Sequence, residues 1–287
     1  MRIVIRNEYG SFVCCGARDK GTARIQAIEG LGTPEKEISS VTFAGTAGFS
    51  FQSTRDTERT ITLTADFFAE PREVQKLYRI IYRPVELYIY AGSVRRRISG
   101  IIARATETDK IIYHRWQAIT LQIICSDPYF HDFDSTLLPI ATYEDKLPNV
   151  YEAAWYVSLP AVATASYTRR TIQNLGDTVL YPVIYVSDIS GLSAEGSYIA
   201  VTNKTTGAAV RIERTFSAGD TVTIDIPHRK ITSAADGSIT TAISDDTVLG
   251  DFYLECGEND IEVTSGNPSN VPHAEIRYNN NYAAVVI

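Results

Sequence analysis

The sequence has 287 residues, enough for two domains that each bury a core without cross-links, and no disulfide-rich miniprotein is indicated. It is 44% hydrophobic and 21% charged, with 17 Tyr and a single Met, and its abundant Thr, Val and Ile favour sheet over helix. The net charge of −7 divides into +3 up to residue 132 (18 Lys and Arg against 15 Asp and Glu) and −10 beyond it (9 against 19), so neither half is basic enough to indicate nucleic-acid binding.

The cysteines and the N-terminal segment indicate the compartment. Cys14, Cys15, Cys125 and Cys256 have neither the number nor the spacing of a disulfide framework, which predicts reduced thiols. Residues 1–10 alternate and lack the apolar core of a signal peptide, and no stretch approaches membrane-spanning length. We therefore expect a protein that is made and folded in a cytoplasm and has no membrane partner.

The first half reads as a set of short strands. The clearest is residues 60–67, where Ile61, Leu63, Ala65 and Phe67 alternate with polar residues at period two. Similar patterns predict further strands at residues 24–28, 37–43, 85–90, 97–103 and 116–125.

Residues 30–59 form an unusual segment, rich in Gly, Ser and Thr but carrying Phe43, Phe49 and Phe51. It is too apolar for a disordered linker and too interrupted by glycine for a core strand, so it indicates either a long arm or an ordinary surface hairpin. As an arm it would be a subunit interface. Arg55 and Arg59 at its return would then meet carboxylates of a neighbouring subunit, or else be solvated turn charges.

One helix is predicted, at residues 71–82. Val74, Leu77, Tyr78 and Ile81 fall at i, i+3, i+4 and i+7, which places them on one helical face that must pack on a sheet. Pro71 suits the first helical turn and Pro84 prevents continuation.

A run of three positive charges follows the helix. Arg95, Arg96 and Arg97 cannot all point the same way on a strand. The run indicates either a solvated turn or an electrostatic contact with a neighbouring subunit.

The second half begins with an irregular stretch, residues 134–160, whose Tyr151, Trp155 and Tyr156, with the later Tyr167, could pack internally or stack on sugar rings. Turn residues such as Asp236 and Gly237 then separate short strands, which is typical of a β-sandwich. The strands are predicted at residues 179–186, 198–202, 208–213, 221–226, 252–256 and 274–278.

No catalytic, cofactor or metal site is predicted. His114, His131, His228 and His273 are scattered without Cys, Asp or Glu partners at ligand spacing. Asp245, Asp246, Glu258 and Asp260 could form a glycosidase pair or a calcium site, but they fall in glycine-bounded turns where carboxylates are common.

The order of short motifs resembles the distal tail (Dit) proteins of siphophages. In the first half the motifs are residues 30–34 (GLGTP), 48–51 (GFSF), 55–59 (RDTER), the helix, 97–101 (RISGI) and 122–130 (QIICSDPYF). In the second half they are residues 203–207 (NKTTG), 219–225 (GDTVTID) and 257–264 (GENDIEVT).

The resemblance implies a mainly β fold of two domains. Residues 1–132 would be a tail-tube-like β-sandwich or barrel with one packed helix and a belt arm at about 30–59, and residues 133–287 a galectin-like or carbohydrate-binding-module-like β-sandwich. Six copies would form a ring around a channel for DNA.

The resemblance also implies a structural role in the virion tail. The ring would join the tail tube to the tail-tip or baseplate complex, with the tail tube protein and a tail-tip protein as partners, no sequence-specific nucleic acid, no cofactor and no active site. Two alternatives stay open: a module that binds host-surface carbohydrate, and a glycan-degrading enzyme of the tail tip.

Overall fold

The computed structural model describes residues 1–16, 23–43, 45, 47–68, 71–81, 83–107, 116–146, 163–267 and 271–285. Contacts divide the chain into two compact units. The first comprises Met1–Phe133 and Asn281–Ile287, and the second comprises Asp134–Asn280. The last seven residues therefore belong with the first unit, whereas the sequence alone assigned them to the second domain.

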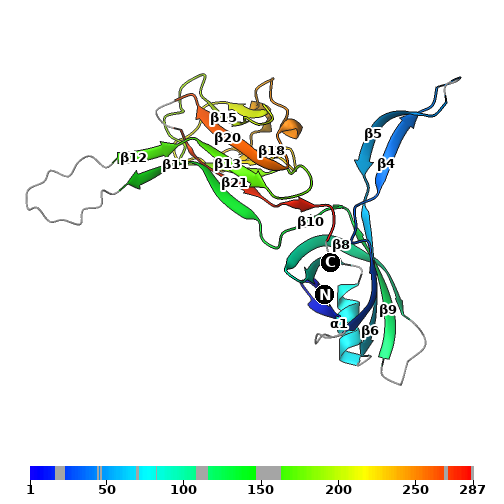
Figure 1. Cartoon of the computed structure of the whole chain (residues 1–287). Coiled ribbons are helices and arrows are strands. Elements are labelled where there is room, and N and C mark those ends of the chain that lie inside the picture. The colour runs from blue at the N-terminus through cyan, green and yellow to red at the C-terminus, as the bar shows by residue number, and fades with distance from the viewer. Residues whose placement is uncertain are drawn as a thin grey trace, which may run out of the picture. The chain divides into compact units, whose positions relative to one another are not determined.

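The first unit is a closed β-barrel (Figure 1). Its strands pair in the order β8-β7-β1-β2-β3-β6-β9, and β9 pairs again with β8. Two short strands, β10 and β22, extend the sheet from β8. The elements are β1 (Arg2–Asn7), β2 (Gly10–Cys15), β3 (Ala23–Glu29), β4 (Lys36–Val41), β5 (Ser50–Asp56), β6 (Arg59–Phe68), α1 (Pro71–Ile80), β7 (Pro84–Ala91), β8 (Val94–Glu107), β9 (Trp116–Cys125), β10 (Phe130–His131) and β22 (Asn281–Tyr282).

Alternation of apolar residues builds the barrel interior. In β7, Val85, Leu87 and Ile89 are buried while the residues between them are partly exposed, as period-two patterning requires. The predicted strand at 60–67 lies within β6, and that at 116–125 coincides with β9. Closure depends on Gly100 of β8, because a β carbon there would stand 2.7 Å from the carbonyl oxygen of Ile124 in β9.

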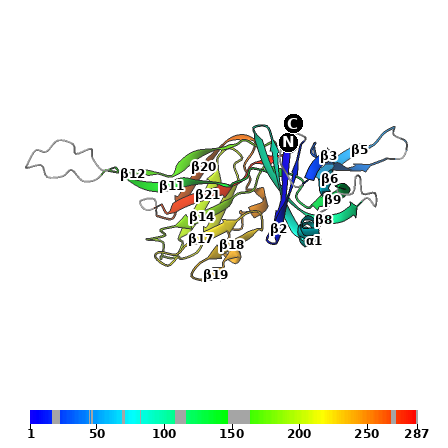
Figure 2. The same ribbon diagram turned by 90° about the horizontal axis from the view of Figure 1, so that it is seen from below.

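The predicted helix is present as α1, which lies against β2 (Figure 2). Leu77 and Ile81 are buried in the barrel core, as expected. Tyr78 was expected on the same face but is 54% exposed, and Ile80 is buried in its place. The tyrosine hydroxyl donates to Glu107 at 2.7 Å, so its polar end is satisfied at the surface and its ring does not enter the core.

Replacing Leu77 by alanine is expected to lower the free energy of unfolding by about 2–5 kcal/mol, since truncating this completely buried side chain leaves a cavity in the barrel core. The exposed Arg79 on the same helix is the matched control, and Arg79→Ala should cost little. Chemical denaturation of both variants measures the difference. Equal losses would contradict the burial of Leu77 as the source of the effect.

The second unit is a sandwich of two sheets with one shared core. The larger sheet has the order β12-β11-β21-β14-β17-β18-β19 and the smaller has the order β13-β20-β15-β16. The elements are β11 (Thr136–Lys146), β12 (Ala163–Tyr167), β13 (Arg169–Asn174), β14 (Val183–Ser187), β15 (Tyr198–Asn203), β16 (Ala209–Glu213), β17 (Val222–Asp225), β18 (Lys230–Ser233), β19 (Gly237–Ser238), η1 (Thr240–Ala242), η2 (Leu249–Asp251), β20 (Gly257–Ser265) and β21 (His273–Tyr278).

Two sequence predictions about this unit are wrong. The stretch from residue 134 begins with strand β11, which pairs with β21 despite a bulge between Pro139 and Ala141. Residues 252–256, predicted as a strand, form only an isolated antiparallel bridge between Leu254 and Leu180. The strand β20 instead begins at Gly257. Within it the buried Asn259 side chain accepts a hydrogen bond from the Glu255 amide and donates to the carbonyls of Glu255 and Gly257.

The mainly β fold class is confirmed by this architecture. Residues 147–162, which include Tyr151, Trp155 and Tyr156, lie outside the described residues, and so does His114.

Candidate subunit-contact site

The arm is an antiparallel hairpin of β4 and β5 that pairs with no other described strand and extends from the barrel (Figure 1). Consecutive residues of both strands are exposed, so both faces of the hairpin are accessible to solvent. Phe43, Phe49 and Phe51 are 60%, 65% and 59% exposed, and Ile38 is 57% exposed. An isolated two-stranded hairpin is marginally stable in water, so this surface calls for a partner.

The root of the arm is held by polar contacts on both strands. The Thr57 amide donates to the Glu35 carbonyl at 3.0 Å, which closes the base of the hairpin. The Asp56 carboxylate accepts a hydrogen bond from the hydroxyl of Tyr129 and lies 3.7 Å from the ammonium of Lys36. The arm therefore leaves the barrel from a defined base.

Arg59 lies at the start of β6 and is only 4% exposed. Its guanidinium donates to the carbonyl oxygens of Pro128 at 2.6 Å, Gly30 at 2.7 Å, Gly32 at 2.5 Å and Ala283 at 2.7 Å. The expected contact of Arg59 with carboxylates of a neighbouring subunit is therefore replaced by a role inside the chain.

The environment of Arg59 is apolar on one side, where the guanidinium carbon lies 4.4 Å from the ring centroid of Phe130. Burial lowers the pKa of Arg59, and the nearby Cys125, Asp127 and Tyr129 oppose that shift. An arginine stays charged in a protein, so four carbonyl dipoles and an aromatic face replace its water. Of the five residues expected at the interface, the structure thus leaves Phe43, Phe49, Phe51 and Arg55 exposed on the arm and buries Arg59 beneath its root.

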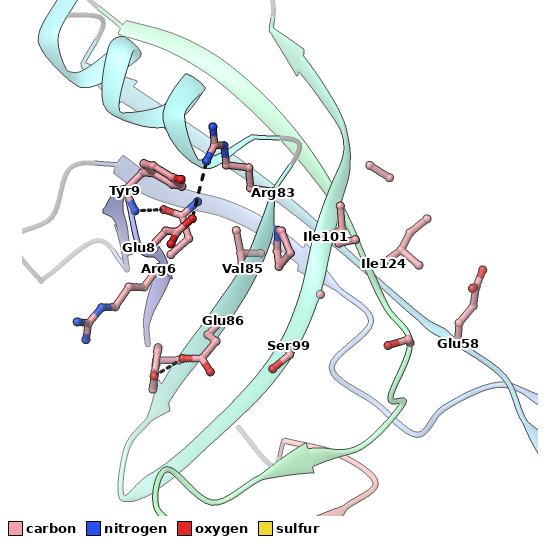
Figure 3. Close-up of a pocket in the computed structure, with 16 residues that line it drawn as sticks. Arg6, Glu8, Tyr9, Glu58, Arg83, Val85, Glu86, Ser99, Ile101 and Ile124 are labelled. Atoms are coloured by element: carbon pink, nitrogen blue, oxygen red, sulfur yellow. Dashed lines mark hydrogen bonds and ion pairs between the residues drawn. The ribbon is translucent and has the colours of Figure 1, made fainter. Parts of the chain in front are cut away.

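A groove of about 1150 Å³ lies on the outer face of the barrel, across β1, β7, β8 and β9 (Figure 3). At one end the Arg83 guanidinium lies 3.8 Å from the ring centroid of Tyr9 and 3.8 Å from a carboxylate oxygen of Glu8. At the other end Ile101, which is 49% exposed, lies with Ile124. The groove therefore offers apolar surface beside a charged, aromatic rim.

Sequence reasoning missed this groove, because its lining comes from segments far apart in the sequence and consists mostly of residues that point outward from the barrel. The isoleucine at position 101 was the available signal, since it places a large apolar residue where alternation calls for an outward side chain.

Successive arginines of the run at residues 95–97 have different partners, as expected for side chains that alternate along a strand. Arg96 pairs with Asp132 at 3.1 Å, and its guanidinium lies 3.5 Å from the ring centroid of Tyr282. Arg97 lies 4.0 Å from Glu86. Both therefore have partners within the first unit.

The groups considered for catalysis or metal binding are engaged in separate pairs. His131 contacts Asp127 at 2.9 Å, His228 contacts Asp225 at 2.9 Å, and the third pair, His273 and Glu275, is 3.5 Å apart. Among the residues that the structure describes, no three His, Cys, Asp or Glu side chains gather as metal ligands, and no helix is long and apolar enough to cross a membrane.

The acidic residues weighed as a glycosidase pair or a calcium site are either paired with an arginine or exposed. Asp260 accepts hydrogen bonds from Arg169, which hold the pKa of its carboxyl below the usual value. Asp245, Asp246 and Glu258 are exposed.

The second unit carries a small exposed apolar surface that the sequence did not reveal. Leu175, Val179 and Tyr181 are 63%, 40% and 46% exposed, and the ring of Tyr181 meets that of Tyr253 edge-on at 6.4 Å.

Comparison with known proteins places these features in context. Residues 176–282 match the family of siphovirus-type tail components, C-terminal domain. No curated protein sequence matches the chain. Among solved structures, the chain is similar to the Dit protein of phage SPP1, which is described as a paradigm of the hub adsorption apparatus in phages infecting Gram-positive bacteria. The two share 15% identity over 91% of this chain and 93% of that one, with a TM-score of 0.64.

Two further similar chains come from the phage P2 baseplate in its activated conformation, one with Ca and one with Sr. Each is 12% identical, covers 99% of this chain, and has a TM-score of 0.49.

Proposed function

We propose that the chain is a phage tail protein and that six copies of it form a ring-shaped hub between the tail tube and the tail-tip complex, because residues 176–282 match the C-terminal domain family of siphovirus-type tail components. This family is one of structural tail components. The proposal includes no catalytic role, no cofactor, assembly in the host cytoplasm, and the tail tube and tail-tip proteins as partners.

The observation that carries the proposal is the solvent-exposed hairpin arm of β4 and β5. Its three phenylalanines and Ile38 expose apolar surface that soluble monomers avoid. A projecting arm on one side of a subunit can be met by a different patch on the next, which is a head-to-tail interface. Such an interface closes into a ring when the rotation per subunit divides the circle, and the resemblance to distal tail proteins implies six subunits.

We place the receiving surface in the groove on the outer face of the barrel. The arm tip, residues 42–52, carries no charged side chain, which suits the apolar floor at Ile101 and Ile124. Arg55, nearer the root, would meet the charged rim, where the carboxylates of Glu8 and Glu86 lie. Apolar contact at the centre with charges at the rim is the usual anatomy of a specific interface.

The test is the mass of the protein in solution over a wide concentration range. The intact chain should assemble as a ring, and Ile101→Glu should dissociate it, because a carboxylate would then be buried in the groove. Leu137→Glu is the matched control, since Leu137 is 50% exposed in the second unit, and it should leave the ring intact. A monomeric intact chain would exclude the self-assembling ring, and equal effects of both substitutions would exclude the groove.

We also propose that the two units fold separately, with Met1–Phe133 and Asn281–Ile287 as the ring-forming unit and Asp134–Asn280 as the sandwich. The charge difference between the halves and the two separate cores support this. Limited proteolysis is expected to cut where the chain passes between the units, near residues 133–134 and 280–281, and to leave two resistant fragments. Cleavage confined to the arm, with the region around residue 133 protected, would contradict separate folding.

A second candidate function, binding of host-surface carbohydrate, is favoured by the Tyr181 and Tyr253 pair on the second unit, since exposed rings can stack on sugars. A glycan array probed with the intact chain and with Tyr181→Ala tests it. Binding to a defined glycan that is lost in the variant would support this function, and the absence of binding would remove it.

A further inference from the structure

We infer that Arg59 and residues 281–285, the C-terminal segment, hold the root of the arm in position. The arm can contact a second copy only while this segment is docked on the first unit. The consequence for assembly rests on the proposed function. The docking and its effect on the arm root do not, because all the contacts involved lie within one chain.

The C-terminal segment is fastened to the barrel at two points. The first is β22, which pairs with β10 so that Tyr282 faces Phe130 and Asn281 faces His131. The Tyr282 hydroxyl donates to Asp132 at 3.3 Å. Its ring lies under the guanidinium of Arg96, which itself pairs with Asp132. The segment thus extends the sheet that the barrel strands begin.

The second point is apolar. Val285 is 5% exposed and belongs to the barrel core, and its amide donates to the carbonyl of Leu31 at 2.9 Å. Leu31, itself 6% exposed, belongs to the same core and lies five residues before β4. The C-terminal segment therefore contacts the chain where the arm begins.

Arg59 completes this connection. Its guanidinium binds the carbonyls of Gly30 and Gly32, on either side of Leu31, and also that of Ala283 in the C-terminal segment. Three consecutive carbonyls at the outgoing root of the arm thus accept hydrogen bonds, two from Arg59 and one from Val285. Because Arg59 follows β5 by only a few residues, its side chain also ties the returning strand to the outgoing one.

The chemistry of the side chain explains why an arginine is needed. Its planar fork presents five donors at fixed angles, and here it reaches four carbonyl oxygens on three separate segments. A lysine keeps the charge but has one nitrogen and three donors, so it cannot bridge the same set. Arg59 is a positioning residue for the arm, acting through the backbone at its root.

The test compares Arg59→Lys and Val285→Ala with Arg55→Lys as the control. Arg55 is the neighbouring arginine of the same charge but is exposed on the arm. Amide hydrogen exchange is measured at Thr57, whose amide closes the arm base, and at Val285. To separate the root from the ring, every variant is made in a background with Phe43, Phe49 and Phe51 replaced by serine, and also in the natural sequence, where mass is measured.

Exchange at Thr57 is expected to accelerate about tenfold or more in both variants, and at Val285 in Arg59→Lys, with the Arg55→Lys control unchanged. Amides of β8 and β9 should stay protected, which shows that the barrel is folded. In the natural background both variants should assemble poorly.

Unchanged exchange at Thr57 would overturn the positioning role. Faster exchange with undiminished assembly would overturn its link to assembly while leaving the proposed ring intact. An intact chain that never assembles would instead count against the ring, and the exchange data would still decide the role of Arg59.

Discussion

Replacing Phe43, Phe49 and Phe51 together by serine is expected to convert the proposed ring into monomers without unfolding the barrel. The three side chains are 60%, 65% and 59% exposed and belong to neither core, so their removal should not lower the free energy of unfolding. At an interface, however, truncating a buried aromatic residue commonly costs about 2–4 kcal/mol. Three such changes should weaken each subunit contact by about a thousandfold or more, even if their effects are not additive.

The matched control replaces Leu175, Val179 and Tyr181 by serine. These residues are 63%, 40% and 46% exposed and lie in the second unit, so the control removes a comparable set of apolar side chains from another surface. Mass in solution and thermal unfolding are measured for both triple variants. Assembly should be lost only in the arm variant. If the arm variant still forms the ring, or if both variants dissociate alike, the arm is not the contact.

Replacing Gly30 by alanine is expected to lower the free energy of unfolding by at least about 3.5 kcal/mol. Gly30 has φ of +87°, which costs a residue with a β carbon about 1–2 kcal/mol. A β carbon there would also stand 2.2 Å from the carbonyl oxygen of Thr60, so the backbone must shift, at a cost of about 1–3 kcal/mol. The shift would also disturb the hydrogen bond from Arg59 to the Gly30 carbonyl, which adds about 1.5–3 kcal/mol.

Gly92→Ala is the matched control, which separates the cost of a positive φ from the cost of the close approach to Thr60. Gly92 also has a positive φ, +62°, but a β carbon at this position would meet no atom within 4 Å. Gly92→Ala should therefore lose only the conformational part, about 1–2 kcal/mol, in chemical denaturation. Equal losses in the two variants would show that the close approach to Thr60 does not contribute.

Local patterns in the sequence were sufficient for the fold class and for most individual elements. Alternation identified β6 and β9 nearly to the residue, and the spacing of Leu77 and Ile81 identified α1. These predictions succeed because a side chain's direction on a strand or helix follows from its position alone. The same patterns failed for β11 and β20, where a bulge and a buried, hydrogen-bonded asparagine replace simple alternation.

The sequence by itself also determined which residues of the arm are apolar, since Phe43, Phe49 and Phe51 stand out in a segment of small polar residues. Only the tertiary structure decided what Arg59 does and where the C-terminal segment belongs. Gly30, Pro128 and Ala283 are far from Arg59 in sequence, and closure of the barrel brings their carbonyls to one guanidinium. An arginine after a turn has the same local pattern whether it is solvated or buried, because its partners are chosen by packing between distant segments, which no local spacing records.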